Sequence, residues 1–100
     1  MTRRRKQTKE LTEWKNAVKD RDKRMCVICG SKTYLNAHHI IPFAKANSNT
    51  NHLIANGISL CPLHHKWGNI SAHKNGLWFF KWMWIYRRAQ IKLLWDFVLA

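Results

Sequence analysis

The sequence predicts a small α+β domain in which one helix precedes two short strands and a second helix follows them. Three observations support this fold class. Apolar residues recur at helical spacing early in the chain, two short segments have the composition of strands, and a proline shortly after the second segment stands where a helix accepts it in its first turn. The 100 residues suffice for one domain with a small core.

The first helix is expected over residues 8–23, where three apolar side chains recur on one face: Leu11, Trp14 and Val18. Residues 34–41 are expected to form the first strand, which Pro42 ends. Residues 44–56 are rich in asparagine and small polar residues, so they are expected to form a loop. A second strand is expected over residues 57–60.

A helix is expected to begin near Pro62, because proline is tolerated in a first helical turn. The polar and aromatic residues that follow are expected to continue this helix to Lys74. Asn75-Gly76 then offers a C-terminal cap.

Residues 77–99 are unusually apolar and contain four of the six tryptophans. No membrane insertion is expected, because charged residues keep every uncharged stretch shorter than a bilayer span: Lys81, Arg87, Arg88, Lys92 and Asp96. The segment is expected to be mainly helical, although residues 78–86 also fit the alternation of a strand. It is predicted to complete the core or to contact a second copy or a protein partner. Membrane-surface binding and base stacking by the tryptophans are further alternatives.

Four residues have the spacing of a zinc site: Cys26, Cys29, Cys61 and His64. Each x2 step lets two side chains from one tight turn converge on a metal, and four such ligands complete a tetrahedral structural site. A disulfide framework is not expected, because three cysteines are an odd number and the N-terminus runs directly into charged residues. We therefore expect a structural Zn²⁺ and a reducing, cytoplasmic location.

The chain carries a formal net charge of +13, which predicts a polyanionic partner such as nucleic acid. Residues 23–95 contain no carboxylate, so any second metal site there would use histidine, asparagine, backbone carbonyls, water or substrate oxygens. Several basic residues are expected to contact phosphates and to make binding dependent on salt: Arg3, Arg4, Arg5, Lys45, Lys66 and Lys74.

The motifs occur in a fixed order, and together they resemble the HNH endonuclease family between residues 14 and 66. They are Trp14 and Val18 with Arg21-Asp22, Cys26-Val-Ile-Cys29-Gly30, Leu35-Asn36-Ala37-His38-His39-Ile40-Ile41-Pro42, Asn56-Gly-Ile-Ser-Leu-Cys61, and His64-His65-Lys66. The resemblance implies a ββα-metal core, the His-Me finger, with a structural zinc knuckle as in small phage and bacterial members. The expected parts are a flexible basic arm (1–9), a zinc-stapled nuclease domain (10–76) and the tryptophan-rich segment (77–100).

The resemblance implies that His39 is the general base that deprotonates the attacking water. It also implies that His38 and His65 bind a catalytic divalent ion and that Asn56 orients His39 or the metal. This chemistry is consistent with histidine, because an imidazole that is neutral near pH 7 can accept a proton from water. Imidazole ligands suit Mn²⁺, Ni²⁺ or Zn²⁺, whereas Mg²⁺ prefers oxygen, so all four ions are candidates.

The family usually has a cysteine where His64 stands. The spacing, and not the resemblance, therefore assigns His64 to zinc, and an exchange of roles between His64 and His65 remains open. His52 and His73 match no family position, so we expect them to be solvated or to contact phosphate.

The function implied is a metal-dependent DNA endonuclease that hydrolyses phosphodiester bonds, nicking one strand or cutting two, in the cytoplasm of a cell or of a phage host. RNA is a further possible substrate. The alternative is a zinc-stabilised nucleic-acid-binding module without catalysis, for example in a phage DNA-packaging assembly. That alternative explains the charge and the zinc ligands but not the further site residues, which are His38, His39, Asn56 and His65.

Overall fold

The computed structural model describes residues 8–41 and 52–99. Its elements are helix α1 (Lys9–Arg21), strand β1 (Asn36–His39), the 3-10 turn η1 (Ile54–Asn56), strand β2 (Gly57–Leu60), the π-turn η2 (Leu63–Trp67), helix α3 (Gly76–Tyr86) and helix α4 (Arg88–Leu99). The predicted α+β class is confirmed. Residues 1–7 of the predicted basic arm, Pro42, Lys45 and most of the predicted polar loop lie outside the described residues. The arm was predicted to extend to residue 9, which is wrong, because Thr8 caps α1 and Lys9 begins it.

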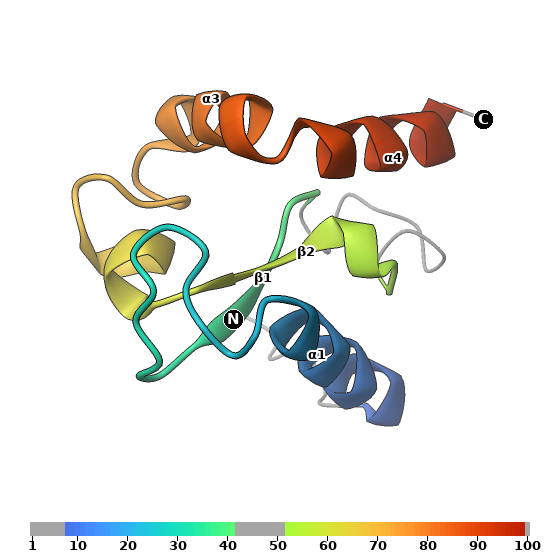
Figure 1. Ribbon diagram of the computed structural model, residues 1–100, viewed down its shortest axis with the longest axis horizontal. Coiled ribbons are helices and arrows are strands. Elements are labelled where there is room, and N and C mark those ends of the chain that lie inside the picture. Colours follow the sequence, from blue (N-terminus) through green and yellow to red (C-terminus); the bar gives the residue numbers. More distant parts are fainter. Residues whose placement is uncertain (1–7, 42–51, 100) are drawn as a thin grey trace, which may run out of the picture.

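The two strands form an antiparallel hairpin in which His38 lies opposite Ile58 and His39 opposite Gly57. Helix α1 packs on one side of the hairpin, and α3 and α4 cross its other side (Figure 1). The second strand matches its predicted bounds, and the first is shorter than predicted but still ends at the histidine pair. The hairpin is therefore the middle layer of the molecule.

Alternate strand residues face opposite layers, as the pleat of a strand requires. Ala37 of β1 packs toward α1, where the buried side chains are Leu11, Trp14 and Val18. Ile58 and Leu60 of β2 face the opposite way, into the larger core formed with Phe79, Met83 and Ile91. These two clusters fix the faces of the hairpin, and with them the directions of its histidines.

Asp22, directly after α1, joins three parts of the chain. Its buried carboxylate accepts hydrogen bonds from the Arg21 and Arg87 guanidinium groups and from the backbone amide of Ser59, at 2.8–3.0 Å. Ion pairs to Arg21 and Arg87 balance the negative charge of this carboxylate, whose side chain is only 1% exposed. Helix α1, strand β2 and the junction of α3 with α4 are thereby held together.

The helix expected from Pro62 begins there, but its predicted continuation to Lys74 is wrong, because η2 ends at Trp67. The chain makes only a π-turn, in which the Gly68 amide donates to the Leu63 carbonyl at 2.8 Å, and then turns back. Asn75 does not end a helix but begins α3, because its side-chain oxygen accepts a hydrogen bond from the Trp78 amide at 3.1 Å. Asparagine is as well suited to this N-cap position as to the C-terminal position we expected.

The C-terminal segment is helical, as predicted, and the strand alternative for residues 78–86 is wrong. It is two helices and not one, because the backbone leaves helical geometry at Arg87. Four of its apolar side chains are buried: Phe79, Met83, Ile91 and Leu94. Others are exposed: Leu77, Phe80, Trp84, Ile85, Tyr86, Leu93 and Trp95. The segment thus completes the core, and contact with a second copy or partner through residues 77–99 stays a prediction.

None of the described helices is long and apolar enough to cross a membrane.

Candidate active site and metal centres

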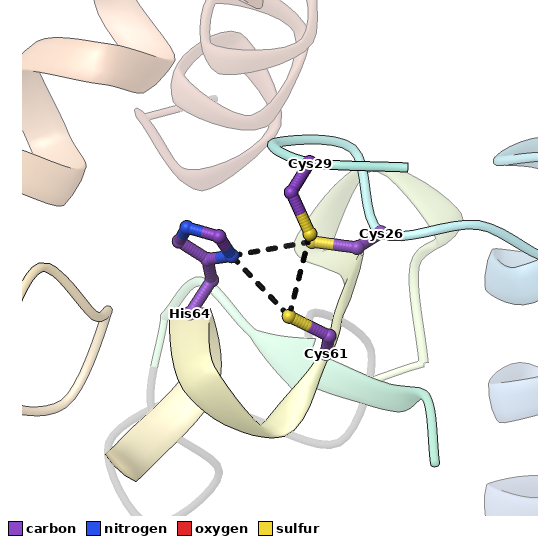
Figure 2. Close-up of side chains that lie close together, drawn as sticks. All are labelled: Cys26, Cys29, Cys61 and His64. Carbon is purple, nitrogen blue, oxygen red and sulfur yellow. Dashed lines mark hydrogen bonds between the residues drawn. The ribbon is translucent and has the colours of Figure 1, made fainter. Parts of the chain in front are cut away.

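The three cysteines and His64 lie together at one end of the hairpin. Their side chains point toward one another, and the ligand atoms all lie within 4.8 Å of each other (Figure 2). Cys26 and Cys29 come from the turn before β1, whereas Cys61 and His64 lie at the end of β2 and in η2. The predicted Cys3His cluster is therefore formed by two segments that are distant in sequence.

The separations between these atoms fit one tetrahedral ion. The sulfurs of Cys29 and Cys61 are 3.6 Å apart, and Nδ1 of His64 lies 3.2 Å from the Cys61 sulfur and 3.8 Å from that of Cys26. Zinc bound at its usual distances would hold two sulfurs about 3.8 Å apart and a sulfur and a nitrogen about 3.6 Å apart. The cluster can accordingly hold a structural zinc ion.

The backbone around Cys26 favours zinc binding. The Gly30 amide donates to the Cys26 carbonyl at 2.8 Å, and Gly30 has φ +80°, a conformation that glycine adopts at little cost. Burial raises the pKa of Cys26, but hydrogen bonds from the amides of Cys61, Cys29 and Ile28 outweigh that effect, so its pKa is lowered. Amides directed at sulfur favour the thiolate, which is the form that binds zinc.

A second cluster consists of His38, His65 and His73, whose ligand nitrogens also lie within 4.8 Å of one another. The Nε2 atoms of His65 and His73 are 3.1 Å apart, close to the roughly 3.3 Å expected of two imidazoles on one tetrahedral ion. His38 presents its ring edge-on to both, with ring centroids 5.1 Å from His65 and 5.0 Å from His73. Phe79 contacts His38 from the core side. The arrangement can hold a divalent ion through nitrogen ligands.

The chain reaches this cluster by reversing direction after η2. The amide of Ala72 donates to the His64 carbonyl at 2.8 Å, and the amide of His73 donates to the His65 carbonyl at 3.0 Å. These two bonds place the His73 side chain beside that of His65. Because His64 and His65 are adjacent, the cysteine cluster and the histidine cluster share one backbone segment.

The electrostatics keep the histidine cluster neutral. Burial lowers the pKa of His38 to about 3, and repulsion from His65, His73, His39 and Lys66 adds to this effect. Burial, with His73 and Lys66 nearby, lowers the pKa of His65 to about 4, and the pKa of His73 is lowered by burial and by Lys66. All three imidazoles are therefore unprotonated at pH 7, as metal ligands must be.

His39 points to the opposite face of the hairpin from His38, because neighbouring strand residues alternate. Its ring stacks on the indole of Trp14, with centroids 4.0 Å apart and planes 10° from parallel. The partly buried His39 is thus held against α1 at the end of β1.

Asn56 is fully buried, and its side chain bonds to the backbone of Ile41. Its Oδ1 accepts from the Ile41 amide at 2.7 Å, and its Nδ2 donates to the Ile41 carbonyl at 3.3 Å. The backbone around Asn56 is held in turn by Arg21 and Gln90, which donate to carbonyls of residues 54, 55 and 57. Asn56 therefore fixes the segment that directly follows His39.

The structure gathers six of the predicted site residues into two clusters, whereas His39 and Asn56 belong to neither and lie at or beside the His39–Gly57 end of the hairpin. His64 joins the cysteines, as the spacing predicted, and His65 joins His38, as the family resemblance implied. His73, which we expected to be solvated, belongs to the histidine cluster, whereas His52 belongs to neither described cluster. No local motif in the sequence marks His73, because its place depends on the turn that closes on His65.

Comparison with known proteins gives one match. The model of the HNH endonuclease family matches residues 26–81, which include both clusters, His39 and Asn56 but neither α1 nor α4. No curated protein and no solved structure matches the chain. With the match covering more than half of its residues and both sets of candidate metal ligands, the chain belongs to the HNH endonuclease family.

Proposed function

We propose that this protein is a metal-dependent DNA endonuclease that hydrolyses phosphodiester bonds. The family implies a nucleic-acid substrate, and the net charge of +13 supports binding to a polyanion. The observation that carries the proposal is the cluster of three neutral histidines, one of which, His38, directly precedes His39 on β1. Plasmid cleavage distinguishes nicking of one strand from cutting of two, because open circles and linear DNA migrate differently.

In this proposal His38, His65 and His73 hold the catalytic ion. A divalent ion bound there would neutralise negative charge that develops on the phosphate and the leaving oxygen. No carboxylate belongs to this cluster within the described residues, so Mn²⁺, Ni²⁺ or Zn²⁺ should serve better than Mg²⁺. The cysteine cluster would hold a structural zinc and thereby fix the backbone from which His65 projects.

His39 is proposed as the general base that accepts a proton from the attacking water. It directly follows His38, a proposed ligand of the ion, at the end of β1, so the proposed base and the proposed metal site are joined by one strand. Asn56 supports His39 indirectly, by binding the backbone two residues later. Lys66 and other basic residues near the cluster would neutralise neighbouring phosphates.

The test is cleavage of supercoiled plasmid by wild type, His39→Ala and His52→Ala with Mg²⁺, Mn²⁺, Ni²⁺, Zn²⁺ or chelator. His52→Ala is the matched control, because it removes a histidine that lies in neither described cluster. Circular dichroism and zinc content establish that each variant is folded. We expect metal-dependent cutting by wild type and by His52→Ala, and a loss of at least about 100-fold in His39→Ala.

Two results would decide against the proposal. Wild-type protein that is folded and zinc-loaded but cuts with none of the ions is not a nuclease on its own. If that protein still binds DNA in a salt-sensitive way, the alternative of a zinc-stabilised nucleic-acid-binding module is supported instead. If wild type and His39→Ala cut equally well, the protein is a nuclease but His39 is not its general base.

A further inference from the structure

The imidazole of His39, the proposed general base, stacks on the indole of Trp14. The two planes are nearly parallel, and Trp14 is only 3% exposed. Trp14 comes from α1, which lies outside the residues matched by the family. The family match therefore assigns no role to this contact.

The indole is held on both sides. Its Nε1 donates to the Leu53 carbonyl at 2.7 Å, which ties the ring to the chain just before η1. Leu11 and Val18, one turn away on either side, pack with it in a buried cluster. A ring that is hydrogen-bonded at its edge and packed along its length offers a fixed surface to whatever stacks on it.

The hairpin makes room for this ring at Gly57. Gly57 lies opposite His39 in the strand register, and it is the residue over which Trp14 passes. A Cβ atom on Gly57 would lie 2.7 Å from Cζ2 of Trp14 and 2.4 Å from Cγ2 of Val18, so only glycine permits this approach. The Asn56-Gly57 pair thus has two separate effects: Asn56 fixes the backbone after His39, and Gly57 admits the ring that His39 stacks on.

We infer that Trp14 is a positioning residue for His39, restricting the orientation of the imidazole that accepts the proton. A histidine side chain can adopt several staggered rotamers about its side-chain bonds. A flat contact with a fixed indole restricts that rotation. This inference rests on the proposed nuclease function.

The test compares Trp14→Leu, which removes the stack but keeps apolar volume, with Trp14→Phe, which keeps a ring without the Nε1 donor. Trp82→Leu is the matched control, because Trp82 is a partly buried tryptophan packed on the other core cluster. We expect Trp14→Leu to lower kcat for plasmid nicking by roughly 10- to 100-fold with KM nearly unchanged, since a small misplacement of a reacting group has costs of this size. Trp14→Phe should recover most of the loss, and Trp82→Leu should retain wild-type kcat.

A second measurement does not depend on catalysis. In NMR spectra of protein labelled in the histidine rings, the His39 ring protons should be shifted upfield by the indole, less so in Trp14→Phe and not in folded Trp14→Leu. If Trp14→Leu does not fold, the wild-type and Trp14→Phe spectra decide, because the inference requires an upfield shift in both.

The outcomes separate the two proposals. Two results would contradict the positioning role of Trp14 without affecting the nuclease proposal. One is folded Trp14→Leu protein that nicks with wild-type kcat, and the other is a wild-type His39 ring that shows no upfield shift. If wild-type protein shows the upfield shift but cuts DNA with none of the ions, the nuclease proposal is wrong. The Trp14–His39 stack then has no catalytic role.

Discussion

Nε2 of His65 and Nε2 of His73 lie 3.1 Å apart, across a turn that the His73 amide closes by bonding to the His65 carbonyl. Two neutral imidazoles at this separation either share one proton or face one metal ion. His38 supplies a third ring to the same space. The pair therefore marks the place where a divalent ion would be bound.

His73→Ala should weaken binding of Ni²⁺ or Mn²⁺ to zinc-loaded protein by roughly 100-fold or more. The reason is that losing even an indirect partner of a metal ligand costs roughly 10- to 100-fold in affinity. Isothermal titration calorimetry at pH 7.5 measures the effect, with His52→Ala as the matched control. Unchanged affinity in His73→Ala would remove this residue from the site.

The free energy of unfolding should decrease as the pH falls below about 6.5. Folding lowers the pKa of His38 from 6.5 to about 3, so in this range the unfolded chain binds a proton that the folded chain does not. At pH 5 this difference is worth about 2 kcal/mol for His38, and less for the more exposed His65.

Urea unfolding at pH 7.5 and pH 5.0, without added divalent ion, measures this loss in wild type and in His38→Gln. Any effect of pH on the zinc cluster is common to the two proteins, so it cancels when their losses of unfolding free energy are compared. We expect a smaller loss in His38→Gln, and an identical loss in the two proteins would contradict a buried, neutral His38.

Zinc should bind with release of protons and with an affinity that falls at lower pH. Burial, together with Cys61 and Cys26, raises the pKa of Cys29 to about 11, so metal-free protein holds at least one thiol proton at pH 7 that zinc must displace. Titration in weak buffer with a pH indicator measures the release. Metal analysis should find about one zinc per chain in wild type and little in Cys26→Ser. Less than about half an equivalent in folded wild type would contradict the four-ligand assignment.

Asn56→Ala should lower both stability and nicking. The change leaves the backbone amide and carbonyl of Ile41 without the partner that Asn56 provides, at a cost of roughly 2–3 kcal/mol, and it loosens the chain after His39. Asn36→Ala is the matched control, because Asn36 is exposed and its side-chain amide donates to the nearby Tyr34 carbonyl. Thermal unfolding and plasmid nicking should both distinguish the two variants, and a stable, active Asn56→Ala protein would exclude this role.

Asp22→Asn should destabilise the protein by roughly 3 kcal/mol, because it leaves Arg21 and Arg87 without their shared carboxylate. Asp20→Asn should cost less than about 1 kcal/mol, since Asp20 forms only an exposed pair with Arg24. Burial alone raises the pKa of Asp22, but hydrogen bonds from Arg21 and Ser59 outweigh it and lower the pKa below 3.8. Its contribution is therefore present at neutral pH and is lost only as the pH falls below that value. Urea unfolding of both variants is the measurement, and equal losses would contradict the role of Asp22.

Much of the site was predictable because its signals are local. The x2 steps place pairs of ligands on single turns, so spacing alone was enough to group Cys26, Cys29, Cys61 and His64. The alternation of a strand sends His38 and His39 to opposite faces wherever the hairpin lies. The N-terminal helix was equally clear, and Thr8 caps it through a hydrogen bond from the Leu11 amide.

Other features were decided by contacts between distant parts of the chain. Asn75 fits either end of a helix, and only the reversal after η2 makes it the start of α3. His73 has no neighbouring motif, and it enters the site because backbone bonds to residues 64 and 65 bring it there.

The sequence by itself determined the family resemblance, the zinc ligands and the histidine pair, because residue type and short spacing are sufficient for these features. The tertiary structure alone decided that His73 completes the second cluster, that Asn56 binds backbone, and that Trp14 stacks on His39. The physical reason is that these contacts join segments up to dozens of residues apart. Their geometry follows from how helices pack on the hairpin, which no spacing along the chain specifies.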